Sequence, residues 1–296
     1  MESSPVRNRL LLLTAAVLFS TGGAALKAVT LNAWQIASFR SGIAAVVLIA
    51  VIPEARRGWS WRMVFVAAAY AATLLTFVLA NRLTTAANAI FLQSTAPLYL
   101  LLLSPLLLHE PIRRADVVYM IAVLGGISLF MMGTQPALAT APNPQRGNAI
   151  ALSSGVTYAF MLAGLRWLEK YGKSATGLAA ATLGNILAFV CALPMALPVH
   201  GGSAMDVVVL LYLGIFQIGL AYFCLTRAIR HIPGLEATTL LMIEPALNPV
   251  WSWLVHGERP GALPITGGAV IIVASLLNTW RRARQEGRRG IPPPAQ

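Results

Sequence analysis

Charge is scarce in this sequence. Only 11% of its 296 residues are Asp, Glu, Lys or Arg, whereas a soluble domain has about 25%. Acids are the rarer sign, with 10 Asp and Glu against 22 Lys and Arg. The only two cysteines, Cys191 and Cys224, both lie within apolar runs. A soluble domain and a disulfide framework are therefore not supported, and both cysteines are expected to be small core residues.

Catalytic and cofactor motifs are missing as well. The sequence has no Walker A loop, no HExxH motif and no His or Cys cluster at metal-ligand spacing. We therefore expect no enzyme activity, no cofactor and no metal site. The net charge of +12 comes from short basic clusters between apolar runs. Such clusters indicate contact with lipid headgroups and no nucleic-acid partner.

Apolar residues are what the sequence has in abundance. They make up 57% of the chain, and the mean hydropathy is +0.70. Apolar runs of about twenty residues, the length that crosses a bilayer as a helix, recur along nearly the whole chain, without the alternation of a membrane β-barrel. We predict an all-α polytopic membrane protein with ten transmembrane helices. The predicted spans are residues 9–29, 34–53, 62–82, 86–108, 115–133, 148–168, 175–198, 206–228, 236–255 and 262–281.

The positions of the basic residues predict the orientation. If the N-terminus is cytoplasmic, the connections on the opposite side hold only Lys27, Arg82, Arg146 and Arg259, and Arg40 lies within a span. All other Lys and Arg residues then fall on the cytoplasmic side, as the positive-inside rule requires. We therefore expect a multi-pass protein of the bacterial inner membrane with both termini in the cytoplasm.

The two halves of the chain repeat. At a fixed offset, Pro97 and Glu110 of the first half fall on Pro245 and Glu258 of the second. Five spans in each half invert the second half relative to the first, and inverted repeats are typical of secondary transporters. The expected organisation is a first five-helix repeat over residues 1–133, a linker over 134–147, an inverted repeat over 148–281 and a basic, proline-rich cytoplasmic tail over 282–296.

Six segments of the sequence carry residue patterns that are typical of a known protein family. They are FSTGGAALK (19–27), ASFRSGIAAVVL (37–48), VLANRLTTAANA (78–89), APLYLLLLSPLLLHEP (96–111), LTRAIRHIPGLEA (225–237) and EPALNPVWSWLVHGERP (244–260). With these segments the chain resembles the EamA-type ten-span exporters of the drug/metabolite transporter superfamily, and it is most similar to the YddG-like exporters of aromatic amino acids. The resemblance implies export of small amphipathic metabolites, aromatic and apolar amino acids first, by alternating access through a central cavity.

Polar and aromatic side chains inside the spans are the candidates for the cavity lining. Two stripes at helical spacing stand out: Tyr70 and Phe77 with their neighbours in the third span, and Asn88, Phe91 and Tyr99 in the fourth. For each residue, a hydrogen bond or contact between helices is the alternative role. The candidate lining residues are Ser20, Tyr70, Phe77, Asn88, Phe91, Tyr99, Tyr158, Met161, Gln217, Tyr222, Glu244 and Asn248.

Glu244 is the acid deepest in a span. An ionised carboxylate at that depth costs several kcal/mol, so Glu244 is expected to be protonated, paired or hydrated. Three roles stay open for it: proton coupling, contact with a substrate ammonium, and a hydrogen bond between helices. Pro245 and Pro249 are expected to kink the span. Arg40 is expected to have a structural role, and Lys27 to be an interfacial anchor or a contact for a substrate carboxylate.

Other functions would require other residues inside the spans. An exporter of organic cations would use Glu244 as the cation's partner, and a carrier of nucleotide sugars or other anions should have several basic residues at midplane depth. A channel needs a continuous polar stripe, and an intramembrane enzyme needs a catalytic constellation; the sequence has neither. The expected partners are a small-molecule substrate and the lipid bilayer, with monomer and homodimer both open.

Overall fold

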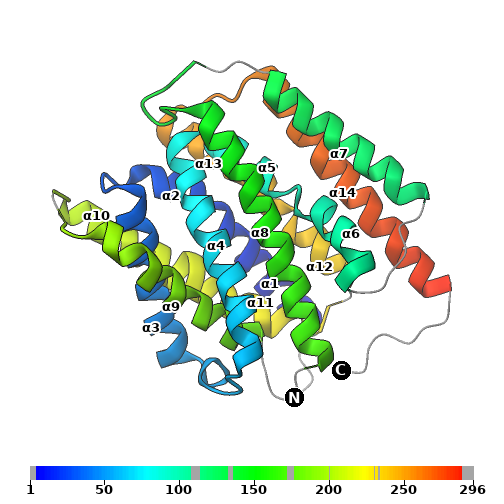
Figure 1. Ribbon diagram of the computed structural model, residues 1–296, viewed down its shortest axis with the longest axis horizontal. Helices are drawn as coiled ribbons and strands as arrows, with labels where there is room; N and C mark the ends of the chain where they lie inside the picture. Colours follow the sequence, from blue (N-terminus) through cyan, green and yellow to red (C-terminus); the bar gives the residue numbers. More distant parts are fainter. Residues whose placement is uncertain are drawn as a thin grey trace.

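The computed structural model describes residues 5–107, 114–132, 136–171, 177–199, 201–229, 231–232 and 234–288. These residues form helices that run side by side in one bundle (Figure 1) and group into ten passages. The passages are α1 (Pro5–Ser20) with α2 (Gly22–Ala28), α3 (Ala33–Val51), α4 (Trp61–Leu83), α5 (Ala86–Gln93) with α6 (Ala96–Leu107), α7 (Arg114–Met132), α8 (Pro144–Tyr171), α9 (Gly177–Ala196), α10 (Ala204–Tyr212) continued through a π-helical segment (Leu213–Leu220) into α11 (Ala221–Ile229), α12 (Gly234–Leu241) with α13 (Ile243–His256), and α14 (Ala262–Arg288).

The predicted all-α polytopic fold is confirmed. In the described part of the chain, eight of the passages are long and apolar enough to cross a membrane, and α7 and the α12–α13 pair supply the other two. Large apolar side chains such as Val46, Phe65 and Val118 are exposed on the bundle surface. A surface of this kind suits lipid, because a helix satisfies its own backbone hydrogen bonds and needs only apolar side chains outside.

Several large contacts between passages occur twice, once with the passages of the first half and once with their counterparts in the second half. The third passage (α4) packs on the sixth (α8), and the eighth (α11) packs on the first (α1). Likewise, α5 and α6 pack on α8, while α13 packs on α1. Two further large contacts join a passage to its own counterpart: α3 lies against α9, and α7 lies beside α14 (Figure 1).

The fourth and ninth passages are interrupted at equivalent places. The helix α5 ends at Gln93 and α12 ends at Leu241, each four residues before a proline of the repeat, Pro97 or Pro245. Proline lacks an N–H and its ring clashes with the carbonyl four residues earlier, so helical hydrogen bonding stops there. Pro249 lies inside α13 without a break, so only the first of the two prolines coincides with an interruption.

The break corrects the predicted stripe of the fourth span. Asn88 and Phe91 belong to α5, whereas Tyr99 belongs to α6. Because the chain turns at residues 94–95, these side chains do not share one continuous helix face, contrary to the prediction from spacing alone.

The predicted last span, 262–281, lies within a longer helix, and one expectation for the cysteines is wrong. The helix α14 continues past residue 281 to Arg288, because Arg, Ala, Gln and Glu in this part of the tail favour a helix and no proline intervenes. Cys191 is exposed on the bundle, whereas Cys224 is buried as expected.

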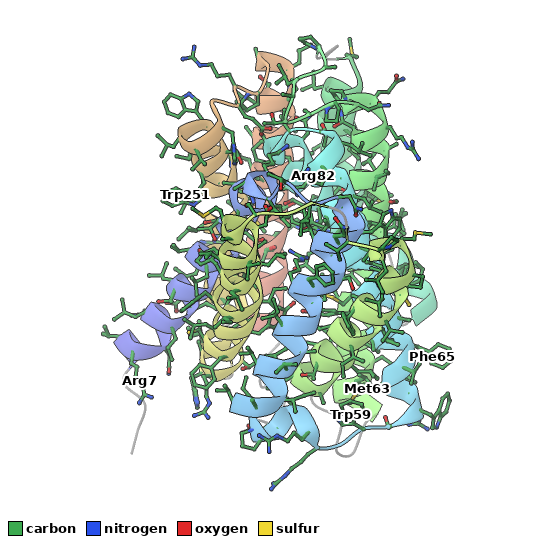
Figure 2. The ribbon with its side chains drawn as sticks, turned by 90° about the vertical axis from the view of Figure 1, so that its left-hand side faces the viewer. Arg7, Trp59, Met63, Phe65, Arg82 and Trp251 are labelled. Carbon is green, nitrogen blue, oxygen red and sulfur yellow. The ribbon has the colours of Figure 1, made fainter. Side chains whose placement is uncertain are left out.

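The two ends of the bundle can be told apart by labelled side chains. Figure 2 shows Arg7, Trp59 and Met63 toward one end and Arg82 toward the other. We refer to these as the Arg7 end and the Arg82 end. The Arg82 guanidinium donates hydrogen bonds to the carbonyls of Val29 (3.0 Å) and Leu31 (3.3 Å), so the connection between α2 and α3 lies at the Arg82 end.

Candidate functional site

Aromatic side chains from both halves of the chain meet inside the bundle. Tyr70 of α4 and Met161 of α8 are buried, and Tyr158 and Tyr222 pack against them. The Tyr222 ring lies 5.8 Å from the Tyr70 ring and 5.3 Å from the Phe19 ring, between centroids. We call these five residues the tyrosine cluster. Aromatic surface of this kind suits an apolar or aromatic ligand.

The position of Tyr70 depends on the seventh passage. A Cβ atom at Gly184 would lie 2.5 Å from Tyr70 Cδ1, so the glycine makes room for the ring. The next residue, Asn185, donates a hydrogen bond from Nδ2 to the Tyr70 hydroxyl at 3.4 Å. The glycine and the amide together orient Tyr70, and its hydroxyl also contacts that of Tyr222.

Arg40 of α3 lies beside the tyrosine cluster. Its side chain is only 2% exposed, and it interacts electrostatically with Tyr70 and Tyr222. Its Nε atom has no hydrogen-bond partner, and none of the ion pairs among the described residues includes it. A buried charge is normally paired or hydrogen-bonded, so the structural role expected for Arg40 is not evident from its contacts.

The eighth passage packs closely on α3 through its π-helical segment. A Cβ atom at Gly214 would lie 2.4 Å from Ile43 Cγ2 and 3.0 Å from the Arg40 carbonyl oxygen. Turns of π-helix are rare and often occur at functional sites. This segment places α11, with Tyr222, next to the Arg40 side of α3. No feature of the sequence had indicated it.

Glu244 also lies near the tyrosine cluster. It is in the first turn of α13, directly after the break at Met242, where the helix dipole favours a negative charge. The side chain is partly buried, and it interacts electrostatically with Tyr158 and Tyr222. Glu244 is thus a partly exposed acid in the middle of a passage and close to two tyrosines of the cluster.

Buried amides lie where α2 meets the second half. A Cβ atom at Gly22 would lie 2.8 Å from Gln217 Nε2, and one at Gly23 would lie 2.4 Å from Asn248 Oδ1. The amide of Asn248 is 1% exposed, and neither its nitrogen nor its oxygen has a hydrogen-bond partner. Gln217 Oε1 is likewise unpartnered. Buried polar atoms of this kind are usually satisfied, so water or a ligand is expected here.

A charged network occupies the Arg82 end. Lys27 Nζ and Glu258 Oε1 lie 2.9 Å apart, with side chains 1% and 2% exposed. Glu258 Oε2 accepts a hydrogen bond from the Ala86 backbone N–H (3.0 Å), and Lys27 donates to the Thr84 carbonyl (2.8 Å). From the sequence, Lys27 was expected to be an interfacial anchor or a contact for a substrate carboxylate. Its observed partner is Glu258, whose first-half counterpart, Glu110, lies outside the described residues.

Asn88 extends this network. Its Nδ2 donates hydrogen bonds to Asn148 Oδ1 (3.0 Å) and Thr84 Oγ1 (3.2 Å), and Thr84 Oγ1 also donates to Asn148 (2.7 Å). These bonds join α5 to α8 near the Lys27–Glu258 pair. Asn88 therefore lies in the network of the Arg82 end and apart from the tyrosine cluster.

The remaining candidates also lie outside the tyrosine cluster. Phe77 and Phe91 pack in the apolar core around α5 and α7, and a Cβ at Gly268 would lie 2.4 Å from the Phe91 ring. Tyr99 lies close to Gly155 of α8. Ser20 accepts a hydrogen bond from Trp251 Nε1 at 2.9 Å, which ties α1 to α13. These contacts are those of helix packing, the alternative that spacing had left open.

The close approach at Gly23 gives a first prediction. In Gly23→Ala, the added Cβ would also lie 2.9 Å from Ala86 Cβ, so we expect a loss of stability of about 1–3 kcal/mol through overpacking. Gly125→Ala is the matched control, because nothing lies within 4 Å of its Cβ. The control should be neutral or stabilising by about 0.5–1 kcal/mol. Unfolding in detergent measures both variants; equal stability would contradict the packing at Gly23.

Comparisons with known proteins agree on the kind of molecule. The family model of the EamA-like transporter family matches residues 8–132 and 145–280. An uncharacterized transporter of Clostridium kluyveri is 28% identical over 134 residues, which is 45% of this chain and 43% of that protein. The uncharacterized transporter YdfC of Bacillus subtilis is 36% identical over 63 residues, 21% of each chain. The matched stretches thus span less than half of these curated relatives.

A solved structure shares the fold. A protein crystal structure superposes with a TM-score of 0.60 and covers 94% of this chain and 98% of its own. The sequence identity is 18%, so this similarity concerns the fold alone.

Proposed function

Because this chain belongs to the EamA-like transporter family, we propose that it is a secondary transporter that exports small amphipathic metabolites, with aromatic and apolar amino acids as its substrates. The observation that carries the proposal is the tyrosine cluster. It takes residues from α1 and α4 of the first half and from α8 and α11 of the second. A site built at the meeting point of two repeats is typical of alternating access.

The inverted-repeat organisation is part of the proposal. The exchange of contacts between halves and the equivalent breaks before Pro97 and Pro245 both support it. The division into residues 1–133, 134–147 and 148–281 agrees with the two separate family matches. In such a transporter, one bundle rocks against the other about the central site.

The proposed orientation places the Arg7 end in the cytoplasm. Arg7 and the basic segment beside Trp59 lie at the same end of the bundle (Figure 2), as the positive-inside rule requires. In this orientation the Lys27–Glu258 network lies at the outer end of the bundle. Together with relatives from bacteria, this supports a bacterial inner membrane with cytoplasmic termini.

The alternative cargoes fit the centre less well. An organic cation would find Glu244 and the aromatic rings, which favour cations, but it would also meet the buried charge of Arg40. Among the described side chains, an anionic metabolite such as a nucleotide sugar would find one basic group, Arg40, beside the tyrosine cluster, and the acid Glu244 near the same rings. A molecule with both charges and an apolar body fits all three features.

Counterflow in liposomes tests the proposal. Vesicles that contain the purified protein and are loaded with unlabelled L-phenylalanine should take up labelled L-phenylalanine well above protein-free vesicles. Lysine and a nucleotide sugar serve as comparison substrates and should exchange at background. Exchange of an organic cation or a nucleotide sugar without exchange of any amino acid would overturn the amino-acid assignment.

A further inference from the structure

We propose that Arg40, together with the hydroxyl groups of Tyr70 and Tyr222, binds the carboxylate of a zwitterionic amino acid, while Glu244 faces its ammonium group. This inference rests on the proposed transport through the tyrosine cluster. It gives Arg40 a role in specificity, where the sequence had suggested a structural one.

The burial of Arg40 requires a partner. Arg40 as a whole residue is 2% exposed, so its guanidinium has lost much of its hydration, and a buried charge without compensation is costly. The described residues contain three ion pairs: Arg9 with Glu236, Lys27 with Glu258, and Arg281 with Asp116. Arg40 takes part in none of them, and its Nε donor is unpartnered. A ligand carboxylate would complete the site.

The donors around Arg40 suit a carboxylate. A guanidinium presents several N–H groups in a planar fork that matches two carboxylate oxygens. The hydroxyl of Tyr70 already accepts a hydrogen bond from Asn185 and contacts Tyr222. Two touching hydroxyls have two protons and use at most one between them, so at least one O–H is available to an added oxygen atom.

An opposite charge lies near the same ring. Tyr222 interacts electrostatically with Arg40 and with Glu244, and the two charged groups form no ion pair with each other in the described structure. A zwitterionic amino acid bound beside Tyr222 would bring its carboxylate to Arg40 and its ammonium to Glu244. Phe19, Tyr158 and Met161 supply apolar surface for the side chain of the ligand.

Ligands that lack one of the two charges test whether Arg40 binds the carboxylate. An amine or amide without a carboxylate leaves Arg40 unpaired and places a second cation near it. Removing one partner of a buried, hydrogen-bonded charge pair typically weakens binding about 30-fold or more. An exporter that recognises only cations or aromatic rings would show no such loss.

The experiment is counterflow in liposomes with four probes of one shape: L-phenylalanine, L-phenylalaninamide, phenethylamine and 3-phenylpropanoate. The wild-type protein should exchange phenylalanine about 30-fold better than the amide or the amine. Equal exchange of phenylalanine and its amide would overturn the carboxylate subsite and leave the transport function in place. If none of the amino acids tested and none of the four probes exchanges, the proposed function itself fails.

Variants distinguish a specific role of Arg40 from a general effect of removing a positive charge. In Arg40→Gln, the preference for phenylalanine over its amide should fall to about twofold or less, and Arg40→Lys should keep an intermediate preference. The matched control is Arg82→Gln, which removes an arginine that bonds backbone carbonyls at the Arg82 end and should keep the wild-type preference. An unchanged preference in Arg40→Gln would overturn the inference. If that variant fails to fold, exchange of the four probes by the wild-type protein decides the inference.

Discussion

Replacing Glu258 with alanine is expected to lower the free energy of unfolding by about 3–5 kcal/mol. The substitution leaves the Lys27 ammonium without a counter-ion at a site where its side chain is only 1% exposed. It also removes the acceptor for the Ala86 N–H at the start of α5. The cost comes mainly from the stranded charge, because a buried ammonium has lost its hydration.

A double variant separates the stranded charge from the lost contact. Lys27→Met combined with Glu258→Gln removes both charges, and it should regain most of the stability lost in Glu258→Ala. The exposed pair of Arg9 and Glu236, with side chains 54% and 33% exposed, is the matched control. Glu236→Ala should cost at most about 1 kcal/mol. Thermal unfolding in detergent measures all three, and a Glu258→Ala loss as small as that of the control would contradict a buried pair.

The same pair bears on the transport cycle. Lys27 belongs to α2 of the first half, and Glu258 follows α13 of the second. In the proposed alternating-access cycle, an opening between the two halves at the Arg82 end would separate these two charges. The attraction between Lys27 and Glu258, 2.9 Å apart, would oppose that opening.

The fold could be predicted because hydropathy determines which segments enter a bilayer. The predicted span 62–82 differs from α4 by one residue at each end. Prolines in the ninth span predict a disturbed helix, and a break does precede Pro245, although Pro249 lies inside α13. The orientation, with both termini in the cytoplasm, stays a prediction from where arginine and lysine lie. Each of these properties depends on a local stretch of sequence and needs no knowledge of which helices touch.

The site could be predicted only in part, for the opposite reason. Tyr70, Tyr158 and Tyr222 were candidates because aromatic residues in spans are conspicuous. The pairing of Lys27 with Glu258 was not foreseen, because the two residues come together only when the first and ninth passages pack. Phe91 was wrongly grouped with Tyr99, because helical spacing assumes that the helix continues.

Glu244→Gln is expected to abolish transport driven by a pH gradient while exchange continues, weakened by the loss of the charge that faces the substrate ammonium. We infer that Glu244 is the coupling group, because it is the carboxyl that faces the tyrosine cluster. One pH unit stores about 1.4 kcal/mol per proton, so one-to-one coupling supports about a tenfold substrate gradient. Glutamine keeps an oxygen that accepts a hydrogen bond from a substrate ammonium, but it does not release a proton at ordinary pH. The ratio of substrate concentrations across the membrane should therefore fall to about one.

Measurement in liposomes distinguishes coupling from binding. Labelled phenylalanine is followed with and without an imposed pH difference, and counterflow is recorded on the same vesicles. Glu236→Gln, in the exposed pair with Arg9, is the control and should keep both activities. A tenfold gradient that survives in Glu244→Gln would contradict the coupling role. Equal loss of counterflow and of gradient-driven transport would assign Glu244 to substrate binding alone, because a residue that only carries the proton has no effect on exchange at equal pH.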